Sequence, residues 1–239
     1  MTAALHVHPT TDLAERVLLP GDPGRALLLA QALLEQPKMF NHNRGLWGYT
    51  GRAADGAPLT IQSTGMGGPS AAIVIEELVQ LGARRLVRVG TCGALVGGFA
   101  LGDVIVAREA VSADGTSRAL GAGERVAADP ELTAALEAAA ERELGRTAAS
   151  GAVVTTDLFY DPSGAHADPG PASRSGEAAV AIEMEAATLL RLAQLRGVQA
   201  GCVLAVSDLL GPARGRIDAE AMEAAAQRIG RIAAGALAT

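Results

Sequence analysis

The sequence predicts an α/β fold, with one domain built on a central mixed β-sheet that helices flank. Short β-branched or aliphatic runs alternate along the chain with longer segments of helical period, a pattern typical of such a sheet. Of the 239 residues, 49% are hydrophobic, so the chain can bury one large core. Because neither an internal repeat nor an interdomain linker is evident, we expect a single domain over residues 1–239.

The strands are predicted from short apolar runs that are rich in Val, Ile, Leu and Ala. In chain order, these runs are Arg16–Leu19, Leu59–Ser63, Arg85–Val89, Val104–Ala107, Ala152–Thr155, Ala179–Ile182 and Gly201–Val206.

The helices are predicted from apolar positions that recur with helical period and from residues that begin or end a helix. They are expected at Ala26–Leu34, Pro69–Leu81, Ala186–Ala193 and Asp218–Leu237. Ser112–Asp129 and Asp161–Gly176 are rich in Gly, Pro, Ser and Asp, and are predicted to be loops.

Charge and hydropathy argue against nucleic acid and membranes as partners. Charged residues make up 19% of the chain and the net charge is −6, whereas nucleic-acid phosphates are held by clustered Lys and Arg. No apolar run reaches the ~18 residues of a membrane span, and the first residues lack the features of a signal peptide. We expect a cytoplasmic protein that binds small anions, and neither nucleic acid nor a membrane.

The cysteines and histidines predict neither disulfides nor a metal site. Cys92 and Cys202 lie far apart and outside any CxxC pattern, so both are expected to be reduced. The histidines show no metal-ligand spacing. They are His6, His8, His42 and His166.

Three arginines beside glycines are candidate anion ligands. Arg25 ends the segment Gly21–Arg25, which leads from a strand into a helix, so backbone N–H groups and a guanidinium can converge on a phosphate there. The alternative is a plain Gly-Pro turn. Arg88 lies inside an apolar strand and requires either a carboxylate partner or an anionic ligand. With Arg44, these guanidinium groups suffice to neutralise a phosphate dianion.

The segment Gly65–Ser70 half matches a dinucleotide-binding fingerprint. It lacks the third glycine, and the acidic residue expected about 20 positions later is absent, because Arg85–Ala94 contains neither Asp nor Glu. We interpret it as a close backbone approach to a ligand or as a tight joint between a strand and a helix.

Two pairs of residues at strand ends are candidates for sugar binding and proton transfer. Glu183 and Glu185 stand where a helix begins, so a carboxylate there can accept hydrogen bonds from a vicinal diol, or complement the helix dipole instead. Ser207 and Asp208 end the last predicted strand. Asp208 can donate a proton to a leaving group, or cap a turn.

The adjacent aromatic residues Phe159 and Tyr160 follow a strand. Only 3% of the chain is aromatic, and this pair offers a stacking surface for a planar base, although anchoring in the core explains them equally well.

Together, these segments resemble the hexameric bacterial nucleoside phosphorylases, the family that holds purine nucleoside phosphorylase and uridine phosphorylase. The matching segments occur in the family's order over nearly the whole chain. They are VLLPGDPGR (17–25), NRG (43–45), GMG (65–67), RVGTCGA (88–94), DLFY (157–160), EMEAA (183–187) and SD (207–208).

The resemblance implies a role for each matched residue. Phosphate, the co-substrate, would be held by Gly21, Arg25, Arg88, Gly90 and Thr91, with Arg44 supplied by a neighbouring subunit. The nucleoside would contact Met66, Cys92, Gly93, Phe159, Glu183, Met184 and Glu185. His6 of the neighbouring subunit would contact the 5′-hydroxyl of its ribose. Asp208, aided by Ser207, would be the general acid. A homohexamer is expected, in which a dimer shares these sites.

The resemblance favours the purine branch, and thus phosphorolysis of purine nucleosides. The uridine branch carries a Gln-x-Arg pair after the aromatic residue, which Tyr160–Gly164 lacks, and it lacks the Ser-Asp pair. Thr91 departs toward the uridine branch. The arginine that purine enzymes often place thirteen residues after the acid is Ala221 here. Either Arg214 or Arg216 replaces it from the loop, or proton donation depends on Asp208 and the desolvation of its pocket alone. Uridine phosphorylase, a phosphate-independent nucleosidase and a non-catalytic binding module stay open as alternatives.

Overall fold

The computed structural model describes residues 4–160, 178–210 and 214–238, in which the strands form one mixed sheet. Its strands are β1 (Arg16–Leu19), β2 (Glu35–Asn41), β3 (Gly48–Arg52), β4 (Pro58–Gln62), β5 (Arg85–Ala94), β6 (Val104–Ser112), β7 (Arg125–Ala127), β8 (Ala149–Thr155), β9 (Ala181–Glu183), β10 (Gln199–Leu209) and β11 (Gly215–Arg216).

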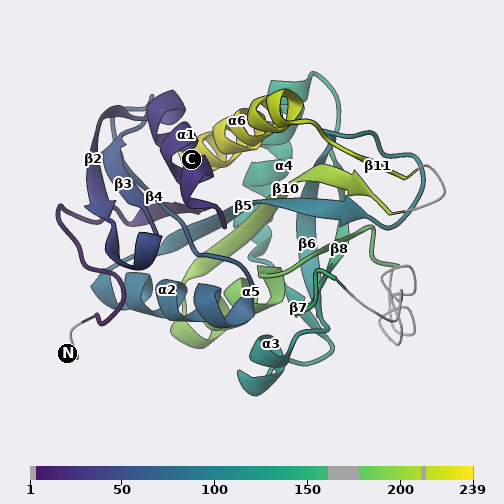
Figure 1. The fold of residues 1–239 in the computed structure, drawn as a ribbon, viewed down its shortest axis with the longest axis horizontal. Helices are drawn as coiled ribbons and strands as arrows, with labels where there is room; N and C mark the ends of the chain where they lie inside the picture. The colour runs from purple at the N-terminus through teal and green to yellow at the C-terminus, as the bar shows by residue number, and fades with distance from the viewer. Residues whose placement is uncertain (1–3, 161–177, 211–213, 239) are drawn as a thin grey trace.

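Helices cover both faces of this sheet (Figure 1). On one face lie α1 (Pro23–Leu33), α4 (Pro130–Leu144) and α6 (Ala219–Leu237), and on the other lie α2 (Gly68–Leu81) and α5 (Ala186–Arg196), with the short α3 (Gly115–Ala119) beside them. The expected fold class, a mixed sheet flanked by helices, is therefore confirmed.

The strand β5 is the centre of the sheet. It runs parallel to β1 on one side and to β10 on the other, and β4 runs parallel to β1. On the side of β10, the pairings β5–β10–β6–β8–β9 return to β5, so these strands close into a ring. Because the central strands are buried on both faces, their sequences are continuous apolar runs rather than alternating ones.

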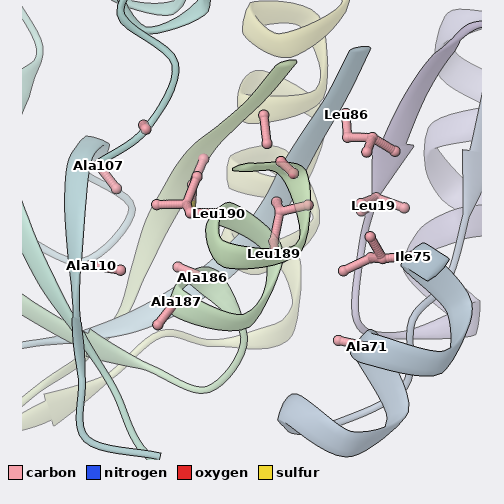
Figure 2. Close-up of a cluster of buried hydrophobic side chains, with 14 of the residues drawn as sticks. Leu19, Ala71, Ile75, Leu86, Ala107, Ala110, Ala186, Ala187, Leu189 and Leu190 are labelled. Atoms are coloured by element: carbon pink, nitrogen blue, oxygen red, sulfur yellow. The ribbon is translucent and has the colours of Figure 1, made fainter. Parts of the chain in front are cut away.

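Neighbouring residues of a strand supply two separate cores. Leu18 packs in the core beneath α1, α4 and α6, whereas the next residue, Leu19, packs in the core beneath α2 and α5. Successive side chains of a strand point to opposite faces, which produces this division. Figure 2 shows the second core, where Leu19 and Leu86 lie near Ile75 of α2 and Leu189 of α5.

The ends of the helices follow from capping residues in the sequence. The carboxylates of Asp22, Asp129 and Asp218 accept hydrogen bonds from backbone N–H groups at the starts of α1, α4 and α6. Gly145 and Gly197 adopt left-handed conformations directly after α4 and α5, as a residue without a Cβ can do at low cost.

The prediction of a loop over Ser112–Asp129 is wrong. This stretch contains α3, which Asp114 caps with its carboxylate, and β7, which pairs antiparallel with β6. The strand β7 has only three residues, of which one is buried, so its sequence shows no apolar run. The second predicted loop, Asp161–Gly176, lies outside the described residues.

Candidate active site

A cavity of about 390 Å³ lies at the carboxyl ends of the parallel strands β1, β4, β5 and β10. In open α/β sheets, ligands bind at this edge. The cavity is large enough for a small-molecule ligand.

Most of the residues selected from the sequence line this one cavity. They are Gly21, Arg25, Met66, Arg88, Thr91, Cys92, Gly93, Phe159, Glu183, Met184, Glu185, Ser207 and Asp208. Further lining residues were not selected as site residues. These are Asp22, Gly65, Thr156, Leu158, Ile182, Leu210 and Arg216. His6, Arg44 and Gly90 are not among the residues that line it in the same chain.

Arg88 is the centre of a buried ionic cluster. Its Nε donates to Glu183 Oε2 at 2.8 Å, and its Nη2 lies 2.5 Å from Glu185 Oε2. Burial would lower the pKa of Arg88, but the two carboxylates outweigh burial and raise it. The sequence left open whether Arg88 pairs with a carboxylate or faces a ligand. In the structure, Arg88 pairs with two carboxylates and also lines the cavity.

Gly90 makes room for the guanidinium of Arg88. A Cβ at Gly90 would lie 2.7 Å from Arg88 Cζ, closer than real contacts allow. Gly90 therefore leaves space for Arg88 by having no side chain, and it is not among the residues that line the cavity.

Glu183 and Glu185 differ in what they contact. The Glu183 carboxylate accepts from the backbone N–H groups of Glu185 and Ala186 at the start of α5, and from Thr155 Oγ1 at 2.5 Å. It therefore complements the helix N-terminus, a role that the sequence also allowed for Glu185. Glu185 itself makes no such cap.

The Glu185 side chain connects the start of α5 with the start of α2 and with β5. Its Oε1 accepts a short hydrogen bond from the backbone N–H of Gly67, while its Oε2 contacts Arg88. Burial raises the pKa of Glu185; Arg88 opposes this effect, and Glu183 adds to it. The Gly65–Ser70 segment thus makes a close backbone approach to a side chain of the site.

Arg25 is a second cation at the same end of the cavity. Its pKa is lowered by burial, with Asp22 opposing this effect and Arg88 adding to it. The backbone N–H groups of Gly24 and Arg25 are engaged by the Asp22 carboxylate at 3.0 and 3.1 Å. These two N–H groups therefore cap α1. Gly21, Asp22 and the guanidinium of Arg25 are what the segment contributes to the cavity lining.

Asp208 enters the cavity because β10 contains a bulge. The register of β10 against β5 shifts between Val206 and Asp208, with Ser207 as the extra residue. Bulges next to active sites redirect side chains. Ser207 Oγ donates to Asp208 Oδ2 at 2.8 Å, and Arg216 Nε lies 3.8 Å from Asp208 Oδ1.

The wall around Asp208 is largely apolar. Leu158, Ile182 and Leu210 line it together with Phe159, which is 52% exposed and contacts Tyr160 edge to face at 4.9 Å between ring centroids. Cys92 also lines the cavity, and burial raises the pKa of its thiol. Asp208 pairs with Gly93, beside which Leu210 and Ile182 lie, and Gly93 is five residues beyond Arg88 on β5. The cavity therefore has a cationic end and an end where apolar side chains surround a carboxylate.

The comparison with protein families agrees with this geometry. Residues 15–238 match the family model described as the phosphorylase superfamily. The chain belongs to the phosphorylase superfamily. The match covers every strand and helix described above.

Characterised superfamily members that resemble this chain are nucleoside phosphorylases of different specificity. A DeoD-type purine nucleoside phosphorylase of Geobacillus kaustophilus is 38% identical over 203 residues, which are 83% of each chain. A uridine phosphorylase of Thermococcus kodakarensis is 42% identical over 205 residues, 82% of this chain and 73% of its own. A solved uridine phosphorylase of Vibrio fischeri ES114 has a TM-score of 0.80 at 24% identity, covering 94% of this chain and 91% of its own. It shows the shared fold.

His6 and Arg44, which were selected from the sequence, lie close to each other but do not line the cavity. His6 is held by Glu77 of α2, and Asn43, the residue before Arg44, donates from its side chain to the backbone oxygen of His6 at 2.9 Å. Arg44 lies in a short 3₁₀ turn with a φ of 57°. These residues belong to one hydrogen-bonded region formed by the N-terminal segment and the turn between β2 and β3.

No helix in the described part of the chain is long and apolar enough to cross a membrane.

Proposed function

We propose that this phosphorylase uses inorganic phosphate to cleave purine nucleosides, giving the free base and ribose 1-phosphate or deoxyribose 1-phosphate. The observation that carries the proposal is the lining of the cavity: Arg25, Arg88 and Glu185 interact with one another, and Asp208 pairs with Gly93, five residues beyond Arg88 on β5. A nucleoside combines a planar base with a polar sugar, and its phosphorolysis needs a dianion beside that sugar.

The cationic end would hold the phosphate. Arg25 and Arg88 would share its charge, with the Thr91 hydroxyl and Gly21 as neighbours, and Arg44 of an adjacent subunit would complete the set. Because Glu183 and Glu185 already neutralise much of the charge on Arg88, Arg25 would supply a large part of the attraction.

The middle of the cavity would hold the sugar. Each oxygen of Glu185 accepts one contact, from Gly67 or from Arg88, and a carboxylate oxygen can accept a second. The vicinal hydroxyls of a ribose can supply those donors. Met184 and Met66 would pack on the sugar, and Met66 is 87% exposed in the isolated chain, as a side chain that covers an entrance would be.

The apolar end would hold the base, and Asp208 would be the general acid. As the bond between C1′ and the purine N9 breaks, its electron pair moves into the base, and Asp208 would give its proton to N7. The sugar then has oxocarbenium character, which the phosphate charge stabilises, and a phosphate oxygen forms the new bond to C1′. Phe159, Cys92, Gly93 and Glu183 belong to the surroundings of the base in this proposal.

Uridine phosphorolysis is the second candidate. Thr91 is the residue typical of the uridine branch, and a relative named as a uridine phosphorylase is 42% identical to this chain. We favour the purine substrate because a carboxylate at position 208 suits a base that accepts a proton at N7, whereas the uracil ring has no such atom.

One assay tests the proposal against all alternatives. The purified protein is incubated with inosine, adenosine, guanosine and uridine, with and without inorganic phosphate, and the release of free base is followed. We expect phosphate-dependent release of purine bases. Release of uracil alone would identify the uridine enzyme, phosphate-independent release a nucleosidase, and calorimetric binding without any release a binding module.

We also propose that the active enzyme is a homohexamer built from dimers that exchange His6 and Arg44. Neither residue lines the cavity of its own chain, and both lie in the same hydrogen-bonded region, so one contact with a neighbour can deliver both. Analytical ultracentrifugation of the purified protein tests the assembly; a fully active monomer would rule it out.

A further inference from the structure

Glu77 is a buried carboxylate on α2 that no step above uses. Only 8% of this residue is exposed, and it faces the N-terminal segment rather than the cavity. Its oxygens accept from the backbone N–H groups of Leu5, His6 and Val7, the last at 2.7 Å. A further contact of 2.8 Å joins Glu77 Oε1 to Nδ1 of the His6 ring. The carboxylate thus holds both the backbone and the side chain of His6.

The partners of Glu77 decide its charge. Burial alone would raise the pKa of Glu77, but the His6 ring and the backbone N–H groups lower it to about 2. Glu77 is therefore ionised at neutral pH, and an ionised carboxylate only accepts hydrogen bonds. The hydrogen in the contact with His6 consequently lies on Nδ1, which leaves the lone pair of the neutral ring on Nε2.

Other polar contacts hold the same segment in place. Asn43 donates to the His6 backbone oxygen at 2.9 Å, and Asn41 Oδ1 accepts from the His8 backbone N–H at 2.9 Å. The side chain of His6 is 28% exposed, and within the described residues no hydrogen bond to its Nε2 is found. The ring is therefore fixed at Nδ1 and open at Nε2.

We propose that Glu77 is a positioning residue that sets the tautomer and direction of His6, so that Nε2 accepts a hydrogen bond from the 5′-hydroxyl of a nucleoside in the neighbouring subunit. This inference rests on the proposed function for its ligand, but the tautomer itself depends on this chain alone. The arrangement matches the way in which a carboxylate on one ring nitrogen fixes the role of the other.

The variant Glu77→Gln separates this role from general support. A glutamine has nearly the same shape, but it is neutral and its amide can either accept from or donate to Nδ1, so the ring is no longer held in one tautomer. Glu76→Gln is the matched control, because Glu76 is the preceding residue of α2 and pairs with Arg196 on the surface instead. Both variants are compared with the unmodified protein.

The kinetic test uses inosine and 5′-deoxyinosine, which lacks the hydroxyl that Nε2 would contact. With inosine, Glu77→Gln should raise KM roughly 5- to 10-fold with a smaller change in kcat, the size of one lost hydrogen bond. With 5′-deoxyinosine, the variant and the unmodified protein should have similar KM values. Equal losses on both substrates would show that Glu77 only supports the fold, and would overturn the proposal.

The spectroscopic test does not depend on any activity. Nitrogen-15 NMR of the His6 ring, assigned with a His6→Ala variant, should show hydrogen on Nδ1 in the unmodified protein and in Glu76→Gln. A ring with hydrogen on Nε2 in the unmodified protein would overturn the proposal, even if Glu77→Gln fails to fold. Absence of phosphorolysis with an Nδ1–H ring would instead count against the proposed function and leave the Glu77 assignment standing.

Discussion

Asp208 and Arg216 lie directly opposite each other on the antiparallel strands β10 and β11, with 3.8 Å between Arg216 Nε and Asp208 Oδ1. Ser207 Oγ contacts the other oxygen of the same carboxylate. The sequence left open whether Arg214 or Arg216 would accompany the acid. The strand pairing favours Arg216, because β11 brings its guanidinium to the cavity, which it lines.

Replacing Arg216 by Ala should lower kcat on inosine by roughly 3- to 10-fold, because an exposed ion pair contributes little free energy. Arg214→Ala, in the same segment, should change kcat less than about twofold, because substitutions of exposed residues usually have small effects. Steady-state kinetics of both variants make the comparison. A larger loss for Arg214→Ala than for Arg216→Ala would reverse the assignment.

Replacing Asp208 by Ala should lower turnover of inosine by ~10²-fold or more, the contribution of a positioned acid. Turnover of 7-methylguanosine should fall much less, since its base is already cationic and needs no proton at N7. Asp12→Ala serves as the control, because Asp12 is an exposed aspartate that does not line the cavity. Unchanged turnover of inosine by Asp208→Ala would remove this residue from the mechanism.

Arg25 and Arg88 should respond differently to replacement by Met. Arg25→Met should raise the KM for phosphate about 10- to 100-fold, since one charge-assisted contact is lost, with little change in stability. Arg88→Met leaves Glu183 and Glu185 without their shared cation, so the free energy of unfolding should fall by about 3–5 kcal/mol. Urea denaturation and phosphate titrations measure the two effects; equal loss of stability in both variants would contradict the assignment of Arg88 as the centre of the ionic cluster.

Exchange of Arg44 between subunits can be tested by complementation. Arg44→Ala and Asp208→Ala should each be nearly inactive alone. After the two variants are mixed, unfolded and refolded together, random pairing should restore about a quarter of the sites, because one site of each mixed dimer has both residues intact. Activity that stays at the level of the separate variants would show that Arg44 does not serve the neighbour.

The sequence determined much of the fold through local signals. The strand Arg16–Leu19 was predicted with the bounds that the structure has, and α2 and α6 begin within one residue of their predicted starts, because proline and aspartate mark the first turn. The strands β2, β3, β7 and β11 and the helix α4 were missed. Five of the seven residues of β2 are exposed, so it shows no apolar run.

The residue types of the cavity were also visible in the sequence, because arginines, glutamates and aspartates at strand ends are unusual beside long apolar runs. What they contact was not visible. Asp22 caps α1 with its carboxylate, while Glu183 and Glu185, two residues apart, have different partners.

By itself, therefore, the sequence determined the alternation of strands and helices and the polar residues that end the strands, since both depend on neighbours along the chain. Only the tertiary structure decided that Arg88 lies between two carboxylates, that a bulge turns Asp208 toward Arg216, and that Glu77 holds His6. The two residues of each such pair are separated by eight to 97 positions. Contacts over these separations are set by strand register and helix packing, which no local pattern encodes.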